Sequence, residues 1–382
     1  MGVAVKPPGP LMAPLIEWRA RQIGDPVERL RFLRTATTRV SQPPINTTTW
    51  KRWRWSALVP IVLWAWLFVP VPIPSTVRPT SAPAQGLNRS NAEDKPAGPV
   101  WLVEENTGFE IYSNGLRVEK EFVTSNRTRT SYGVFRQVAD TPISQNETIG
   151  IVFHSTESHQ APFEPSETRH LKRIGRYLIE YIRQNHSYHY VIDRFGRVFR
   201  IVRESDVANH AGKSVWGDAK GTYIMLNDSF LGVAVEAQTD LTPATNTAQV
   251  HALRVLTEML RTKYTIPSNN CVTHAQVSVN PSNGQIGYHT DWAYGFPFTD
   301  IGLPDNYKLK LASVTAFGFV YESSFLSTSG DRRWPGLIAS LEEVNQQAGA
   351  AGVPAADYRK RLQQRFQNIL NSAPMRERGE EQ

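Results

Sequence analysis

Hydrophobic residues recur along the chain with two different periods, and the period changes several times between residues 149 and 298. Short apolar runs at residues 150–154 and 230–236 predict β-strands. Residues 166–185 and 246–264 instead place apolar side chains three and four positions apart, which predicts amphipathic helices. Strands that alternate with helices are typical of α/β domains, so we expect a mixed central β-sheet flanked by helices.

Residues 56–74 differ from the rest of the chain because they are apolar and carry no charge. The segment is just long enough to cross a bilayer core, which needs roughly 20 such residues. Three basic residues within 51–54 precede it, so the positive-inside rule places residues 1–55 in the cytoplasm. We expect a single-pass anchor in the cytoplasmic membrane, with the following residues on the periplasmic, extracytoplasmic side. The alternative is a cleaved signal peptide ending near residues 82–84, which resemble a small-residue cleavage site.

Composition and pattern divide the remainder of the chain into four parts. Residues 75–99 are rich in Pro, Ser, Ala and Asn, which is typical of an extended linker. Residues 100–148 alternate like short strands with a hairpin at an Asn-Gly pair, so we expect a small β element packed on the main domain. Residues 149–298 form the main domain. Residues 299–382 carry apolar residues at helical spacing and predict a helical C-terminal extension.

The formal net charge of +7 suits an anionic partner such as a cell wall or a membrane surface. The sequence contains no basic stripe interleaved with aromatic residues and no nucleic-acid-binding motif, so we expect no nucleic-acid partner. Cys271 is the only cysteine of the chain, which excludes an intrachain disulfide. Stability therefore depends on the apolar core or on a metal.

Three histidine-containing stretches carry the candidate chemistry. His154 ends an apolar strand, a place where a rigid backbone can hold a metal ligand, although a structural histidine is the alternative. The stretch 271–274 ends in His274, and the stretch 288–291 contains His289 and Asp291. Together they offer the nitrogen and oxygen ligands of a catalytic zinc, with a fourth position left for water.

A series of short motifs around these residues occurs in a characteristic order. The motifs are Phe153-His154-Ser155-Thr156, Tyr188-His189-Tyr190-Val191-Ile192-Asp193-Arg194-Phe195-Gly196-Arg197-Val198, Ala208-Asn209-His210-Ala211-Gly212-Lys213-Ser214, Leu231-Gly232-Val233, Thr273-His274 and Thr290-Asp291. This order resembles the type-2 N-acetylmuramoyl-L-alanine amidase family, which includes peptidoglycan-recognition proteins and amidase-type phage lysozymes. The resemblance covers about residues 149–298.

The resemblance implies a zinc ion bound by His154, His274 and Asp291. Two neutral imidazoles and one carboxylate leave the zinc with about one net positive charge, and zinc lowers the pKa of a bound water to about 7. Two alternatives stay open at this point. His289 can itself be the third ligand with Asp291 behind it, and Cys271 lies at a ligand-like spacing from the second histidine.

The family also implies which residues assist the hydrolysis of an amide. Tyr188 matches a tyrosine near the metal and can donate a hydrogen bond to the oxyanion. His289 occupies a place where many members have a lysine, so we expect it to act as a donor. Bacterial members often carry a glutamate general base where this chain has Ala234. Glu236 lies two residues further on the same strand face and is the candidate base.

His210 and Ser214 match the substrate-side loop of the family, so we expect them to contact substrate. The function implied is the cleavage of the amide bond between N-acetylmuramic acid and the L-alanine of the stem peptide, with peptidoglycan as the partner. The alternative is a peptidoglycan-binding or sensing module without hydrolysis. A membrane-anchored structural adaptor explains the ends of the chain but not the histidines.

Overall fold

The computed structural model describes residues 98–136, 142–240, 244–280, 282–329 and 332–372. All of these residues lie within one compact unit of the chain, residues 89–373. The predicted cytoplasmic tail and the predicted anchor at residues 56–74 lie outside the described residues. Among the residues described, no helix is long and apolar enough to cross a membrane.

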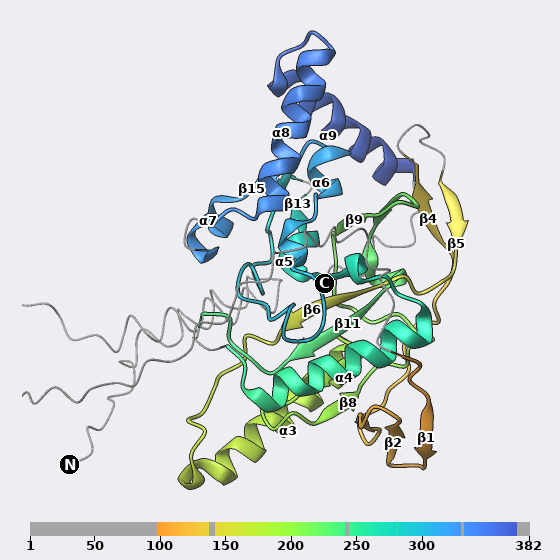
Figure 1. The fold of residues 1–382 in the computed structure, drawn as a ribbon, viewed down its shortest axis with the longest axis vertical. Helices are drawn as coiled ribbons and strands as arrows, with labels where there is room; N and C mark the ends of the chain where they lie inside the picture. Colours follow the sequence, from red (N-terminus) through yellow and green to blue (C-terminus); the bar gives the residue numbers. More distant parts are fainter. Residues whose placement is uncertain (1–97, 137–141, 241–243, 281, 330–331, 373–382) are drawn as a thin grey trace, which may run out of the picture. The chain divides into compact units, whose positions relative to one another are not determined.

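A mixed sheet of eight strands runs through the centre of this unit (Figure 1). In spatial order its strands are β1 (Leu102–Glu105), β2 (Phe109–Tyr112), β3 (Arg117–Glu119), β8 (Val198–Arg200), β7 (Tyr190–Ile192), β11 (Phe230–Val235), β6 (Gly150–Ser155) and β12 (Cys271–Thr273). The last four strands of this order are parallel to one another. Every residue of β6 and β11 is buried, which explains why both read as continuous apolar runs.

Two helices cover opposite faces of this sheet. Helix α4 (Thr247–Tyr264) packs Leu253 and Leu256 against a core that contains Phe153 of β6. Helix α3 (Thr168–Asn185) packs against another core that contains Ala234 of β11. Because side chains alternate along a strand, the residue after Phe153 points to the face opposite α4. The predicted α/β fold is therefore confirmed, and His154 lies on the α3 side of the sheet.

The predicted helix over residues 246–264 is confirmed together with its start signal. Asn246 accepts a hydrogen bond from the backbone nitrogen of Gln249, and the Gln249 side chain accepts one from the backbone nitrogen of Asn246. This reciprocal capping box satisfies backbone donors that the first turn leaves without partners. The cap fixes the start of α4, the first helix after β11 that is longer than one turn.

The region 100–148 contributes strands to two different sheets. Strands β1 to β3 continue the central sheet, because β3 pairs in parallel with β8. The others join a four-stranded sheet whose order is β5 (Ile143–Gln145), β4 (Tyr132–Phe135), β10 (Thr222–Ile224) and β9 (Val215–Gly217). This region is thus built into the main fold through strand pairing as well as through packing.

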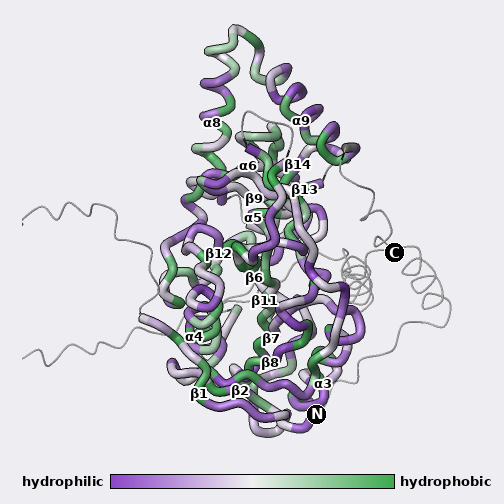
Figure 2. The backbone as a smooth tube through the Cα atoms, turned by 90° about the vertical axis from the view of Figure 1, so that its right-hand side faces the viewer, coloured by the Kyte–Doolittle hydropathy of each residue, from purple (hydrophilic) through white to green (hydrophobic). Residues whose placement is uncertain are grey.

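The C-terminal part of the unit adds one small sheet and several helices. The sheet contains β13 (Val279–Asn280), β14 (Gln285–Ile286) and β15 (Val320–Tyr321), and the helices are α5 (His274–Val277), α6 (Ala312–Thr315), α7 (Ser323–Ser329), α8 (Pro335–Ala350) and α9 (Ala355–Ser372). Short 3-10 helices span η1 (Pro165–Glu167), η2 (Leu226–Asp228), η3 (Ser268–Asn270) and η4 (Asn306–Lys308). Figure 2 shows apolar and polar residues alternating along α8 and α9, and their apolar residues Leu337, Val344 and Phe366 join a core with Val272 of β12.

Candidate functional site

His154 and His274 are brought together by the register of neighbouring parallel strands. Thr273 pairs with Phe153 across β12 and β6, so the next residue on each strand is a histidine. Strand β12 ends there because Thr273 forms a capping box with Gln276 and starts the short helix α5. The centroids of the two imidazole rings lie 4.4 Å apart, and both side chains are buried.

Asp291 reaches the two histidines from the loop that follows β14. Its Oδ1 lies 3.0 Å from Nδ1 of His274, and its Oδ2 lies 3.3 Å from Nδ1 of His154. The backbone nitrogen of Ala275 donates to the carbonyl oxygen of Asp291 at 3.3 Å, which ties the loop to α5. One ligand atom from each of His154, His274 and Asp291 lies within 4.8 Å of the other two.

The protonation states of this cluster suit a divalent cation. Burial, together with the nearby His274 and against the opposing effect of Asp291, lowers the pKa of His154 to about 4, so the imidazole is neutral at pH 7. Burial alone would raise the pKa of the Asp291 carboxyl, but His274 and His154 hold it well below its usual range. Imidazole nitrogens with a carboxylate are a donor set that zinc prefers. In addition, the buried Nε2 atom of His274 has no hydrogen-bond partner among the described residues.

The two other ligand candidates lie outside the cluster. Cys271 belongs to the core beneath α4, with Phe153, and therefore lies on the opposite face of the sheet from His154. The ring of His289 stacks on the ring of His274, with centroids 4.5 Å apart and planes 17° apart. The geometry thus favours Asp291 over both alternatives as the third ligand.

Tyr188 lies beside the cluster, just before β7. Its ring centroid is 5.0 Å from that of His154. Burial, reinforced by the carboxylate of Asp291, raises the pKa of the Tyr188 phenol above its usual value. The phenol therefore stays protonated at neutral pH, and a protonated phenol can donate a hydrogen bond to an oxyanion.

The strand register places Ala234, and not Glu236, next to His154 of β6. Ala234 pairs with His154 across β11 and β6. Glu236 lies just past the end of β11, where its Oε2 accepts a hydrogen bond from the backbone nitrogen of Arg194 at 3.0 Å. Burial raises the pKa of Glu236 to about 7, and Asp193 adds to the effect while the Arg194 nitrogen opposes it. This carboxyl can exchange a proton near neutral pH, but its observed contacts are at the strand end.

His210 lies in the interior beside His154, and its contact with substrate stays a prediction. Its side chain is buried, with 8% of the residue exposed. Its Nδ1 lies 3.2 Å from Nε2 of His154, and its Nε2 lies 3.3 Å from the carbonyl oxygen of Phe230. His210 therefore contacts a candidate metal ligand from behind instead of facing solvent.

The side chain of Ser214 is buried and hydrogen-bonded to the backbone. Its hydroxyl donates to the carbonyl oxygen of Gly212 at 3.1 Å and accepts from the backbone nitrogen of Leu226 at 2.9 Å. The residue is 1% exposed. These contacts fix the loop that carries His210, and the contact of Ser214 with substrate stays a prediction.

The sequence of the central region matches a known family. Residues 144–291 match the sequence model of the N-acetylmuramoyl-L-alanine amidase family. The resemblance that the motifs indicate is thereby confirmed for this amidase-family segment. No match was found among curated proteins.

Three solved structures illustrate what the segment is similar to. The N-acetylmuramoyl-L-alanine amidase LysC from Clostridium intestinale is 20% identical over 47% of this chain and 94% of its own, with a TM-score of 0.26. The amidase AmiD from E. coli, in complex with anhydro-N-acetylmuramic acid-L-Ala-D-gamma-Glu-L-Lys, is 19% identical over 51% and 65%, with a TM-score of 0.29. AmpDh3 from Pseudomonas aeruginosa, in complex with anhydromuramic pentapeptide, is 18% identical over 57% and 86%, with a TM-score of 0.32.

Glu157 is a residue of the amidase-family segment that the sequence reasoning did not single out. It lies three residues after His154 with a positive φ of 46°. Its Oε1 accepts from the hydroxyls of Ser155 at 2.5 Å and Thr239 at 2.6 Å. Glu157 thus ties the end of β6 to the residues after β11. Its position directly after the first histidine motif, residues 153–156, is the sequence signal for this role.

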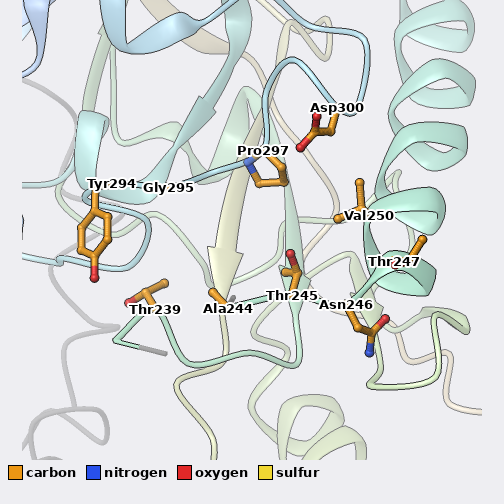
Figure 3. A pocket seen from close by; sticks show the side chains of 10 residues that line it. All are labelled: Thr239, Ala244, Thr245, Asn246, Thr247, Val250, Tyr294, Gly295, Pro297 and Asp300. Atoms are coloured by element: carbon orange, nitrogen blue, oxygen red, sulfur yellow. The ribbon is translucent and has the colours of Figure 1, made fainter. Parts of the chain in front are cut away.

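An open pocket of about 730 Å³ adjoins the loop that carries Asp291. Its lining residues come from the end of the β11 loop, from the start of α4 and from the chain after Asp291, and Figure 3 shows them as sticks. They are Thr239, Ala244, Thr245, Asn246, Thr247, Val250, Tyr294, Gly295, Pro297 and Asp300. Because Thr239 is held by Glu157, the pocket wall is linked through hydrogen bonds to the strand that bears His154.

Proposed function

We propose that this chain is a zinc-dependent peptidoglycan hydrolase that cleaves the amide bond between N-acetylmuramic acid and the L-alanine of the stem peptide. The observation that carries the proposal is the buried cluster of His154, His274 and Asp291. The cluster lies within the segment that matches the N-acetylmuramoyl-L-alanine amidase family. That match supports a peptidoglycan amidase activity, and the donor set supports zinc.

The reaction adds one water molecule across an amide. The C–N bond breaks, the lactyl carbonyl of the muramic acid becomes a carboxylate, and the alanine nitrogen leaves as an amine. His154, His274 and Asp291 would hold the zinc, which would supply a Lewis acid for the amide carbonyl and lower the pKa of a bound water toward neutrality. The protein must also stabilise the oxyanion and deliver a proton to the leaving nitrogen.

Tyr188 and His289 flank the cluster and are suited to these two tasks. The protonated phenol of Tyr188 lies against His154 and donates to the oxyanion. His289 lies against His274 and is partly exposed, next to the exposed Tyr288. Its imidazole can therefore exchange protons with solvent and protonate the leaving amine.

Glu236 is the candidate base, because Ala234 at the position beside His154 has no titratable group. A carboxyl with a pKa of about 7 is well matched to proton exchange at neutral pH. Its side chain reaches the α3 side of the sheet, where a Cβ on Gly175 would lie 3.6 Å from Oε2. This is the face that also carries His154.

We further propose that the enzyme works on the periplasmic, extracytoplasmic side of the cytoplasmic membrane. The apolar segment 56–74 and the basic residues before it support a single-pass anchor with this orientation. Peptidoglycan is located on that side. Such an anchor favours the remodelling of the wall over the recycling of wall fragments in the cytoplasm.

A second candidate function is a peptidoglycan-binding module without hydrolysis. The observation that favours it is Ala234, which leaves the neighbour of His154 without a carboxylate. The two functions differ in the products that they release. A hydrolase frees stem peptides, whereas a binding module stays on intact wall material.

The deciding experiment incubates the purified chain with isolated peptidoglycan, and mass spectrometry identifies the released material. We expect free stem peptides that begin with L-alanine, their loss after treatment with a chelator, and their return with zinc. His274→Ala removes a candidate ligand and is expected to abolish release. His251→Ala removes an exposed histidine of α4 and serves as the matched control. Bound protein on intact glycan, without released peptide, would favour the binding module.

A further inference from the structure

A chain of hydrogen bonds leads from His154 away from the candidate metal and into the backbone of β11. Nε2 of His154 lies 3.2 Å from Nδ1 of His210. Nε2 of His210 lies 3.3 Å from the carbonyl oxygen of Phe230, the first residue of β11. The two imidazole planes are nearly perpendicular, at 85°, and the ring centroids lie 5.3 Å apart.

This chain has one consistent direction, because a carbonyl oxygen only accepts hydrogen bonds. Nε2 of His210 must therefore carry the proton that faces Phe230. In a neutral imidazole the other nitrogen then accepts, so Nδ1 of His210 receives a hydrogen bond from Nε2–H of His154. The remaining nitrogen of His154 is Nδ1, which lies 3.3 Å from Oδ2 of Asp291, another acceptor. Nδ1 of His210 and Oδ2 of Asp291 therefore compete for the single proton of a neutral His154.

The surrounding residues hold this chain in place. A Cβ atom at position 232 would lie 2.6 Å from Cγ of His210, so only a glycine at this position of β11 leaves room for the ring. The guanidinium of Arg129 donates to the same Phe230 carbonyl at 2.9 Å. The backbone nitrogens of His210 and Ala211 both donate to Oδ1 of Asn227, at 3.1 Å and 2.7 Å. Three features therefore hold His210 in place. Asn227 anchors its backbone, Gly232 of β11 leaves space for its ring, and the Phe230 carbonyl accepts from its Nε2.

We propose that His210 is a positioning residue that fixes the tautomer of His154. It keeps the proton of His154 on Nε2, so that the lone pair of Nδ1 faces the candidate metal. The part of this inference that concerns metal affinity rests on the proposed zinc site. The part that concerns the tautomer is a property of the protein without metal and can be measured separately.

Two substitutions of His210 test the roles of its two ring nitrogens separately. In His210→Asn the amide oxygen takes the place of Nδ1 and can still accept from His154. In His210→Gln the amide nitrogen takes the place of Nε2 and can still donate to the Phe230 carbonyl, but the acceptor facing His154 is lost. The two amides have similar size and polarity, so each variant controls for the stability effect of the other. Each is made in the full chain, and circular dichroism compares their folding with that of the wild type.

The first measurement is the tautomer of His154 in metal-free protein labelled with 15N in its histidines, using long-range 1H–15N spectra. We expect the Nε2-protonated form in the wild type and in His210→Asn. In His210→Gln we expect a shift toward the Nδ1-protonated form, which can donate to Oδ2 of Asp291. His154→Asn identifies the signal by its disappearance. An unchanged, purely Nε2-protonated His154 in His210→Gln would overturn the proposal.

The second measurement is the affinity for zinc, by competition with a chromophoric chelator. Partners that orient a ligating histidine contribute about 10- to 100-fold to metal affinity. We expect such a loss in His210→Gln and a much smaller one in His210→Asn. Equal affinities in the two variants would also contradict the proposal. A wild-type chain that binds no zinc would refute the proposed function, whereas the tautomer measurement would still decide the role of His210.

Discussion

His154 and Asp291 face each other across the candidate metal site, but the fold holds them in different ways. His154 lies in β6, which is paired along its length with β11 and for three residues with β12. Asp291 lies in a loop, and the next residue, Trp292, has a left-handed φ of 58°. One half of the site is therefore held by strands and the other half by an irregular loop.

The loop half depends on side chains from further along the chain. The hydroxyl of Tyr307 donates to the carbonyl oxygen of Trp292 at 2.7 Å. The indole nitrogen of Trp334 donates to the carbonyl oxygen of Ala293, also at 2.7 Å. Both donors lie beyond residue 298, the expected end of the main domain. The strand half is therefore fixed by backbone pairing between strands, whereas the loop half depends on side-chain hydrogen bonds from residues further along the chain.

The largest effect is expected from Asp291→Ala, which removes the only metal ligand that the loop half provides. Zinc content should fall from about one ion per chain to near zero, and peptide release should fall to background, because three protein ligands define a catalytic zinc site. Metal analysis after dialysis and the peptidoglycan assay measure the two effects. Asp300→Ala removes an exposed aspartate nearby and should change neither. Full zinc content in Asp291→Ala would show that the loop is dispensable for the site.

Trp334→Ala tests whether the loop half is supported from the C-terminal helices. The buried indole packs against Phe325 and Tyr307, and its removal should lower the free energy of unfolding by about 3–5 kcal/mol. Zinc affinity should fall as well, because the Ala293 carbonyl loses its donor. Urea denaturation and chelator competition measure these changes. Trp101→Ala removes a tryptophan that is 59% exposed and should cost less than about 0.5 kcal/mol.

Glu236→Gln probes the end of the strand half through the pH dependence of stability. The folded-state pKa of about 7 lies above the unfolded value of 4.5, so the folded protein binds more protons than the unfolded chain between these pH values. The free energy of unfolding of the wild type should therefore fall by about 2–3 kcal/mol as pH rises through this window.

The amide of Glu236→Gln cannot ionise, so this variant should lose most of that decrease. Urea denaturation at pH 5 and pH 8 gives the comparison, and Glu342→Gln on the exposed face of α8 is the control. A slope that persists in Glu236→Gln would assign the pH dependence to another group. The same variant tests the candidate base, since peptide release should fall if Glu236 accepts a proton in the reaction.

Gly232→Ala perturbs the strand half with the smallest chemical change. The added Cβ would meet Cγ of His210 at 2.6 Å, and such overpacking costs about 1–3 kcal/mol of stability. The displaced ring should also weaken zinc binding in the manner of His210→Gln. Gly349→Ala places a methyl group in open space at the end of α8 and should be neutral or slightly stabilising. If zinc affinity survives in Gly232→Ala, the position of the His210 ring does not matter for the metal.

The same contrast explains which features could be predicted from the sequence. The apolar runs of β6 and β11 and the capping box at Asn246 are local signals, and the structure reproduces them. The contact between His210 and His154 could not be predicted from the sequence. It depends on Gly232, a residue of β11 whose lack of a side chain leaves room for the His210 ring. A loop motif read along the chain favours a surface role, and only the packing shows that the ring points inward.

The joining of the C-terminal helices to the main sheet has a consequence for modularity. Val272 and Trp216 share one core with Leu337, Val344 and Phe366. A fragment limited to residues 144–291 would leave this apolar surface exposed to water, and it would also lack the strand that pairs with β8. The segment that matches the amidase family is thus not expected to fold as an independent domain. Its boundaries as a cooperative folding unit extend well beyond those of the family that it matches.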